Sequence, residues 1–449
     1  MEKKVEKMGT LLKKHQLTSF RIIIIGFAAA ILAGCLLLML PVATKGAGGA
    51  SFEDALFTST SAVCVTGLVV QDTATYWSSF GQFVILCLIQ IGGMGVITIA
   101  VAIAMVSGKK ISLMQRSTLQ DAISAPHTGG IVRLTGFIIK MTVCFELLGA
   151  VLMFPVFCKE FGAGKGIWYS VFHAVSAFCN AGFDLMGIRQ QYSSLVSFAG
   201  QPVINVVIML LIIAGGIGFL TWDDIRVNHL HFRKYRLQSK VIITTSGILI
   251  LLPAIYFFFG EFAELPMGER VLSSLFQAVT PRTAGFNTVD MTMMTQTGIG
   301  LIILLMLVGG SPGSTAGGMK TTTLAVLCAS SSVFRGKDAH YFGRRIPEET
   351  IRSATALLML YLTFFLAGGL IISRIEGLPL LSCLFETASA IGTVGLSLGI
   401  TTKLGLVSRG ILIFLMYVGR VGGLTLIYAA VSGTKVSSSK LPQEKITVG

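Results

Sequence analysis

The chain has 449 residues, of which 53% are hydrophobic and only 12% are charged. Soluble domains carry about 25% charged residues, so this composition excludes a cytosolic enzyme, a disulfide-stapled secreted domain and a nucleic-acid-binding module. The formal net charge is +14, but the basic residues gather in particular loops and require no nucleic acid as a partner. The composition predicts an integral protein of the lipid bilayer.

Eight apolar segments along the chain are long enough to cross ~30 Å of hydrocarbon. Six carry no charge: residues 22–40, 77–108, 190–222, 241–260, 291–319 and 353–373. The other two are residues 134–157, which contain Lys140 and Glu146, and residues 410–434, which contain Arg420. A charge inside the membrane is costly and usually functional. We expect Lys140 to reach the aqueous face and Glu146 to pair with a neighbouring span.

The loops between these spans alternate in charge. Lys and Arg concentrate before the first span, after the second, fourth and sixth spans, and in the C-terminal tail. An excess of these residues marks the cytoplasmic side of a membrane. The sequence therefore predicts a multi-pass protein with both termini in the cytoplasm, whose first span is too long and too far from the N-terminus for a cleaved signal peptide.

Each odd-numbered span is followed by an apolar segment too short to cross the membrane, at residues 55–63, 167–178, 271–280 and 380–391. Each segment leads into a turn that contains a glycine, and a Gly-Gly pair follows in the next span. This recurrence indicates an internal fourfold repeat, with units at 22–108, 131–226, 240–335 and 350–434 between cytoplasmic segments 1–21 and 435–449. We predict an all-α membrane protein in which four pseudo-symmetric units, each a transmembrane helix, a pore half-helix with a filter loop and a second transmembrane helix, surround a central pore.

The four glycine turns are the candidate ion-binding site. Irregular backbone at membrane depth is tolerated only where it is buried or lines a watery cavity, and rings of carbonyl oxygens can replace the hydration shell of an ion. The C-terminal end of each half-helix would favour cations. The candidate filter residues are Val63, Cys64, Val65, Thr66, Gly67, Phe178, Cys179, Asn180, Ala181, Gly182, Pro281, Arg282, Thr283, Ala284, Gly285, Ile391, Gly392, Thr393, Val394 and Gly395.

With these four turns, the chain resembles the Trk/Ktr/HKT superfamily of potassium transporters, and within it the KtrB-type membrane subunits of bacterial Ktr uptake systems. The resemblance spans essentially the whole chain. It implies K⁺ as the transported ion, since Gly67 occupies the position that decides between K⁺ and Na⁺, with Na⁺ as a possible second ion. It also implies a bacterial cell membrane, a homodimer and a separate cytosolic nucleotide-binding subunit, a KtrA-like ring, because this chain has no nucleotide motif of its own.

The third unit contains a second unusual segment. Pro312 removes a helical hydrogen-bond donor, and neighbouring glycines remove stiffness, so we expect a polar loop at 310–318 inside the membrane. The superfamily has a gating loop at the matching position. The candidate gate residues are Gly310, Ser311, Pro312, Gly313, Ser314, Thr315, Ala316, Gly317, Gly318, Lys320 and Arg420.

Two further expectations concern charge. Aligning the Gly-Gly pairs places Arg420 level with Gln90, Ile213 and Thr315, below the filter. Within the filter region, we expect Arg282 and Glu386 to form an ion pair that stabilises the turns; a direct role in ion selection is the less favoured alternative.

The residues leave alternatives open. An alternating-access secondary cation symporter would also bind ions between repeats, but its repeats are more often inverted, so the pore is favoured. A structural subunit would not need four glycine turns, and no nucleophile–base pair or metal cluster in the sequence indicates an enzyme. Coupling to Na⁺, the controlling nucleotide and the oligomeric state do not follow from the residues.

Overall fold

The computed structural model describes residues 18–107, 111–123, 129–332, 336–423 and 425. The predictions for most of segment 1–21, for the end of the last span and for the tail at 435–449 lie outside these residues.

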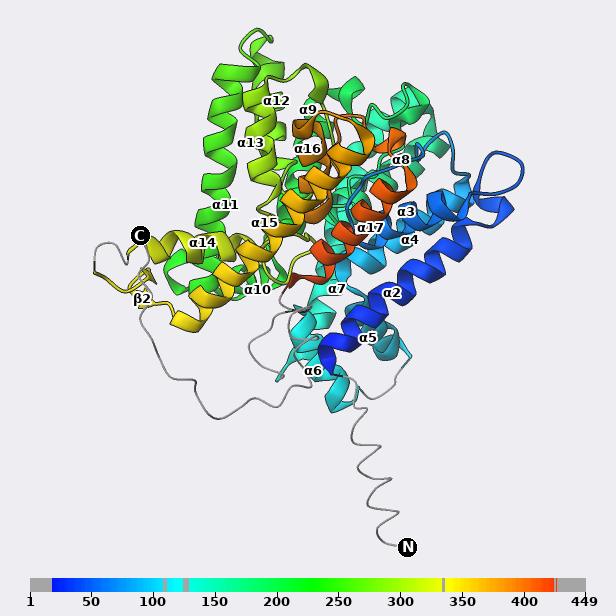
Figure 1. The fold of residues 1–449 in the computed structure, drawn as a ribbon. Helices are drawn as coiled ribbons and strands as arrows, with labels where there is room; N and C mark the ends of the chain where they lie inside the picture. Colours follow the sequence, from blue (N-terminus) through cyan, green and yellow to red (C-terminus); the bar gives the residue numbers. More distant parts are fainter. Residues whose placement is uncertain (1–17, 108–110, 124–128, 333–335, 424, 426–449) are drawn as a thin grey trace, which may run out of the picture.

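The described chain folds into four units of the same design, each a long helix, a short helix and a second helix (Figure 1). In chain order the units are α2 (Ser19–Leu38), α3 (Phe52–Val63) and α4 (Ser79–Met94); α7 (Ile131–Phe161), α8 (Ala163–Phe178) and α9 (Pro202–Gly216); α11 (Leu237–Tyr256), α12 (Met267–Val279) and α13 (Gln296–Met306); and α15 (Glu348–Glu376), α16 (Leu380–Gly392) and α17 (Leu406–Val421). The short helices α3, α8, α12 and α16 are the half-helices that precede the glycine turns.

Shorter elements connect these units. They are α5 (Val96–Val106), α6 (Leu113–Ile123), α10 (Phe219–Asn228), α14 (Thr321–Ser330), the two-stranded hairpin β1 (His340–Tyr341) and β2 (Arg344–Arg345), a π-helical turn η5 (Phe257–Glu261) and the 3-10 turns η1 (Pro41–Ala43), η2 (Met186–Ile188), η3 (Val196–Phe198), η4 (Phe232–Lys234), η6 (Met291–Met293) and η8 (Thr401–Lys403). In Figure 1, helices α5, α6 and α10 lie lower in the view than the four half-helices.

Local sequence sets where several helices begin. The hydroxyl of Ser51 accepts a hydrogen bond from the amide of Asp54 (3.1 Å) at the start of α3. Ser78 and Thr295 cap α4 and α13 in the same way, at 3.2 and 3.0 Å. Such caps satisfy amides that have no partner inside the helix.

The second helices are not the continuous spans expected from hydropathy. Gly95, with φ of 87°, separates α4 from α5, and Gly218, with φ of 96°, precedes α10. Each pair bends by 96°, so the apolar segments at 77–108 and 190–222 each contain two helices rather than one continuous helix. Helix α17 ends in the same way, at Gly422 with φ of 89°. Left-handed backbone is accessible to glycine without steric cost, and hydropathy carries no information about it.

Within the described residues, four helices are long and apolar enough to cross a membrane, and the two bent pairs raise this number to six. The four are the first helices of the units, α2, α7, α15 and α11 with its π-helical extension. Helix α13 has 11 residues and α17 has 16, so the expected total of eight spans stays a prediction.

The four units form a closed ring. The second helix of each unit packs against the half-helix of the next: α4 on α8, α9 on α12, α13 on α16, and α17 back on α3. This last contact is a seam between the two ends of the chain. There, the guanidinium of Arg409 pairs with the carboxylate of Asp54 (3.3 Å), and the hydroxyl of Tyr417 donates to the carbonyl of Ile24 (2.7 Å).

The seam gives a first prediction. The side chains of Arg409 and Asp54 are only 20% and 13% exposed, so we expect D54N and R409M each to lower the melting temperature in detergent. In a double-mutant cycle with D54N/R409M, the coupling free energy should be about 1 kcal/mol. Strictly additive losses would show that the pair does not stabilise the seam.

Candidate ion pathway

The four glycine turns share one backbone conformation. Each glycine has positive φ: 90° at Gly67, 68° at Gly182, 76° at Gly285 and 95° at Gly395. Two positions earlier in each turn a residue with a side chain also has positive φ, at Val65 (56°), Asn180 (57°), Thr283 (69°) and Thr393 (52°). Non-glycine residues rarely adopt this conformation, so its recurrence identifies four equivalent turns.

The turns meet around one point. A Cβ atom added to Gly67 would lie 2.5 Å from the carbonyl oxygen of Ala181, and one on Gly182 would lie 2.7 Å from that of Ala284. Gly285 faces the carbonyl of Val394, and Gly395 faces that of Thr66, more closely still. Each glycine therefore touches the carbonyl that precedes the glycine of the next unit, and the fourth unit returns to the first. The structure brings the predicted strands 63–67, 178–182, 281–285 and 391–395 together in this ring.

Hydroxyl groups on the half-helices hold the strands. The Oγ atoms of Ser61 and Ser389 accept hydrogen bonds from the amides of Gly67 (3.1 Å) and Gly395 (3.0 Å). In the other two units the hydroxyls of Ser176 and Thr280 donate to the carbonyls of Phe183 (2.7 Å) and Phe286 (2.6 Å). These four residues were not predicted from the sequence, although Ser61 and Ser389 both stand six positions before their glycine.

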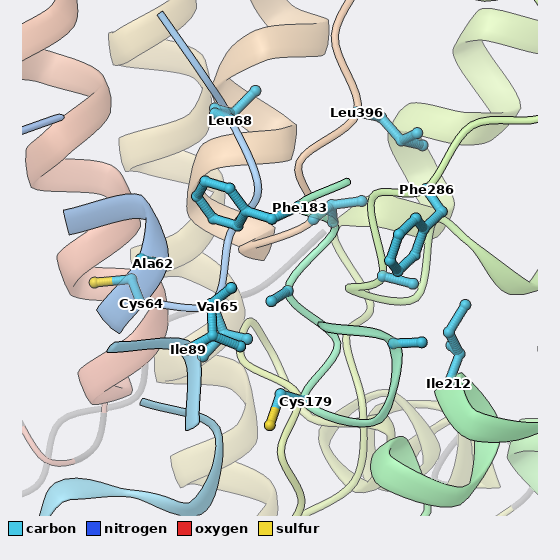
Figure 2. Packing of buried hydrophobic residues seen from close by; sticks show 14 of the residues in the cluster. Ala62, Cys64, Val65, Leu68, Ile89, Cys179, Phe183, Ile212, Phe286 and Leu396 are labelled. Atoms are coloured by element: carbon cyan, nitrogen blue, oxygen red, sulfur yellow. The ribbon is translucent and has the colours of Figure 1, made fainter. Parts of the chain in front are cut away.

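Apolar side chains anchor the strands from behind. The residue after each glycine is large, apolar and at most 2% exposed: Leu68, Phe183, Phe286 and Leu396. Figure 2 shows these side chains around the converging turns, together with Cys64 and Cys179. The burial of these side chains fixes the strands in place. The ring itself is built from backbone atoms of the strands.

A cavity of about 240 Å³, which we call the outer cavity, opens above the ring. Its lining includes all four ring glycines and the acidic side chains of Asp72, Asp184 and Asp290. Asp72 accepts hydrogen bonds from the amides of Thr75 (2.8 Å) and Tyr192 (3.1 Å).

A second cavity of about 220 Å³, which we call the inner cavity, lies on the other side of the ring. Its lining includes residues of a non-helical segment in the third unit. Helix α13 ends at Met306 and α14 begins at Thr321, so residues 307–320 form this segment. The amide of Gly309 donates to the carbonyl of Met319 (2.8 Å), which closes its neck. We call residues 310–318 the inner loop.

Two basic side chains, Lys320 and Arg420, line the inner cavity. The guanidinium of Arg420 donates to the carbonyls of Thr315 and Gly92, and to that of Gly93 at 3.1 Å. It thus links α17 to the inner loop and to the end of α4. The ammonium of Lys320 donates to the carbonyl of Ala316 (2.8 Å) within the loop.

The expected alignment of Arg420 is wrong. Gly92, Gly215 and Gly419 each lie against the carbonyl of a half-helix end, that of Val63, Phe178 and Ile391 respectively. By this contact, Arg420 corresponds to Gly93 and Gly216 rather than to Gln90 and Ile213. The Gly-Gly pairs are misleading as markers because those at 92–93 and 215–216 begin at the glycine that contacts the half-helix. The pair at 422–423 begins three residues after the corresponding glycine, Gly419.

The expected ion pair between Arg282 and Glu386 is also wrong. The guanidinium of Arg282 donates to Ser246 (3.0 Å). The carboxylate of Glu386 instead accepts hydrogen bonds from Ser397 (2.6 Å) and Thr401 (2.7 Å) in the wall of the outer cavity. Hydroxyls close in sequence satisfy Glu386, so it needs no basic partner from another unit.

Glu146 has a partner that the sequence did not identify. The side-chain amide of Gln90 donates to the carboxylate of Glu146 at 3.3 Å. The thiol of Cys179, in the second filter strand, lies 3.9 Å from the same carboxylate. This contact joins the first and second units behind the ring.

Comparisons with known proteins agree with this geometry. A sequence model of the TrkH family, described as a cation transport protein, matches residues 18–441. The chain is 40% identical to the potassium/sodium uptake protein NtpJ of Enterococcus hirae, over 98% of this chain and 100% of the relative. It is 37% identical to the Ktr system potassium uptake protein B of Bacillus subtilis, over 98% of each. The crystal structure of the potassium transporter TrkH from Vibrio parahaemolyticus has a TM-score of 0.71 at 20% identity, covering 92% of this chain and 85% of that one. The predicted all-α membrane transporter fold is confirmed.

Proposed function

Since the chain belongs to the TrkH family of cation transport proteins, we propose that it is the K⁺-translocating pore subunit of a bacterial potassium uptake system. The names of its relatives support K⁺ as the ion, and one of them also includes Na⁺. The family is one of transporters and not of enzymes, in agreement with the sequence analysis.

The observation that carries this proposal is the closed ring of glycine–carbonyl contacts. The four strands that end at Gly67, Gly182, Gly285 and Gly395 form the selectivity filter, in which backbone carbonyls replace the water around K⁺. No Cβ fits between a ring glycine and the neighbouring carbonyl, so selection depends on glycine at all four positions.

The inner loop and Arg420 form the gate. The loop lies between the ring and the inner cavity, and Arg420 holds it through the carbonyl of Thr315. A unit positive charge about 4 Å from a passing cation opposes it by roughly 4 kcal/mol at an effective dielectric constant of 20. That energy is sufficient to slow passage about a thousandfold.

A separate cytosolic nucleotide-binding subunit, a KtrA-like ring, opens this gate by acting on α14, which directly follows the loop. The Ktr systems named among the relatives support a multi-component assembly. The chain works as a homodimer in the bacterial cell membrane, as the family resemblance implies. Both termini lie in the cytoplasm, as the distribution of Lys and Arg predicts.

The filter can be tested at Gly67. In a strain that lacks its own K⁺ uptake, the wild-type chain with its partner should restore growth at low K⁺. G67S should weaken K⁺ affinity and admit Na⁺, because a side chain there meets the Ala181 carbonyl and is strained at a φ of 90°. Uptake of K⁺ and Na⁺ in competition measures the effect.

A matched control is G300S, since Gly300 lies in α13 and no atom of the described residues comes within 4 Å of a Cβ added there. We expect G300S to transport as wild type does. If G67S keeps the wild-type preference for K⁺ over Na⁺, Gly67 is not a filter residue. Failure of the wild type to support K⁺-limited growth would reject the proposed function.

The gate can be tested in proteoliposomes that lack the cytosolic partner. R420A, or a shortened inner loop, should raise K⁺ flux at least tenfold over wild type, because the barrier below the filter is reduced. R352A is the control, since the side chain of Arg352 is 82% exposed at the start of α15. Equal flux through R420A, the shortened loop and the wild type would contradict this gate.

A further inference from the structure

Thr315, at the centre of the inner loop, is bonded to three different parts of the molecule. Its side chain is fully buried. Its amide donates to the carbonyl of Gly215 in α9 (3.2 Å), and its carbonyl accepts from Arg420 in α17. Its hydroxyl donates to the carbonyl of Phe178 (2.9 Å). One residue of the third unit therefore bonds to the second and fourth units at once.

The bond to Phe178 reaches the filter. Phe178 is the last residue of α8 and the first residue of the second filter strand. The corresponding carbonyls of the first and fourth units belong to Val63 and Ile391. Among the described residues, no side chain donates to either of them, whereas that of Phe178 has the hydroxyl of Thr315.

Gly215 leaves the space for this bond. An added Cβ on Gly215 would overlap the carbonyl oxygen of Phe178 and lie 2.7 Å from the hydroxyl oxygen of Thr315. The hydroxyl and the carbonyl thus meet where α9 has no side chain. A packed interior seldom leaves such room by accident.

The loop also presses on the fourth filter strand. An added Cβ on Gly317 would overlap the hydroxyl of Thr393, and one on Gly318 would lie 2.8 Å from the carbonyl of Gly392. The neck of the loop is closed by two backbone bonds, from Gly309 to Met319 (2.8 Å) and from Thr321 to Gly310 (3.0 Å). Because these two bonds hold the base of the loop together, the loop moves as one piece. It can leave the pathway only if the hydroxyl of Thr315 releases the carbonyl of Phe178.

We propose that Thr315 is a positioning residue that determines ion specificity by holding the second filter strand through the Phe178 carbonyl. When the loop is seated, that carbonyl has its donor and the strand keeps the geometry suited to K⁺. When the loop leaves, the buried carbonyl of Phe178 loses its hydrogen bond from the Thr315 hydroxyl, which is costly, and the strand relaxes. Gate position and K⁺ binding are then coupled, and coupling between two sites is reciprocal. This inference rests on the proposed function.

The test compares T315V, which keeps the shape but removes the hydroxyl, with T315S, which keeps the hydroxyl. Both are assayed as the purified chain without its partner, when the loop is seated, for the preference of K⁺ over Na⁺ in competitive ion binding. T363V is the matched control, because within the described part of the chain the hydroxyl of Thr363 bonds only to the carbonyl of Met359 in its own helix (2.8 Å). Losing one buried hydrogen bond should lower the preference by roughly three- to tenfold in T315V, while T315S restores it and T363V equals wild type.

A second measurement needs no variant. Hydrogen exchange of the wild-type chain in detergent should show slower exchange of the amides of residues 311–318 in K⁺ than in Na⁺, since K⁺ in the filter favours the seated loop. Equal exchange in the two salts would overturn the coupling even if T315V did not fold.

The outcomes separate this inference from the proposed function. T315V that conducts faster but keeps the wild-type preference would make Thr315 part of the gate alone and reject its role in specificity. T315S that behaves as T315V would show that shape, and not the hydroxyl, is responsible. A wild-type chain with no preference for K⁺ would reject both the proposed function and the coupling.

Discussion

The structure depends on one constraint, which is that backbone inside a bilayer must find its hydrogen-bond partners within the protein. Half-helices that stop at mid-membrane leave their last carbonyls and the following turn without helical partners. Here four such turns share the problem. Each is bonded to its own half-helix by a hydroxyl group, and each glycine meets a carbonyl of the next unit. The close ring forms because glycine brings backbone against backbone, and the same closeness makes the ring a candidate cation site.

Fourfold similarity ends below the ring. The second helices of the first two units, α4 and α9, break at single glycines, Gly95 and Gly218. The chain then continues as short helices at about right angles to them. The third opens into the inner loop, and the fourth carries Arg420 one residue after the glycine that packs on its half-helix. Arg420 occupies a position that is glycine in the first two units, and its guanidinium reaches the carbonyls of Gly92, Gly93 and Thr315. In the proposed function, selection therefore draws on what the units share, and gating on what distinguishes them.

Much of this architecture could be predicted from the sequence, because hydropathy and recurring glycines report directly on helix length and on turns. The half-helices and the strands that end at Gly67, Gly182, Gly285 and Gly395 follow from that pattern. The right-angle breaks did not, since an apolar run looks the same whether straight or bent. The pairing of Arg282 was mispredicted because charge suggests an acidic partner, whereas the guanidinium of Arg282 bonds to Ser246 and the carboxylate of Glu386 to nearby hydroxyls. Thr315 was one of many loop residues in the sequence, and only the fold reveals its contact with Phe178.

The central claim is that one chain forms a single cation site from backbone of all four units. It is tested most directly by locating an electron-dense K⁺ substitute, Rb⁺ or Tl⁺, by anomalous diffraction from crystals of the full chain. The account predicts anomalous density inside the ring, at similar distances from the strands that end at Gly67, Gly182, Gly285 and Gly395, and its loss when Na⁺ replaces the heavier ion. Density only in the outer cavity beside Asp72 and Asp184, or none in the ring at saturating Rb⁺, would contradict it.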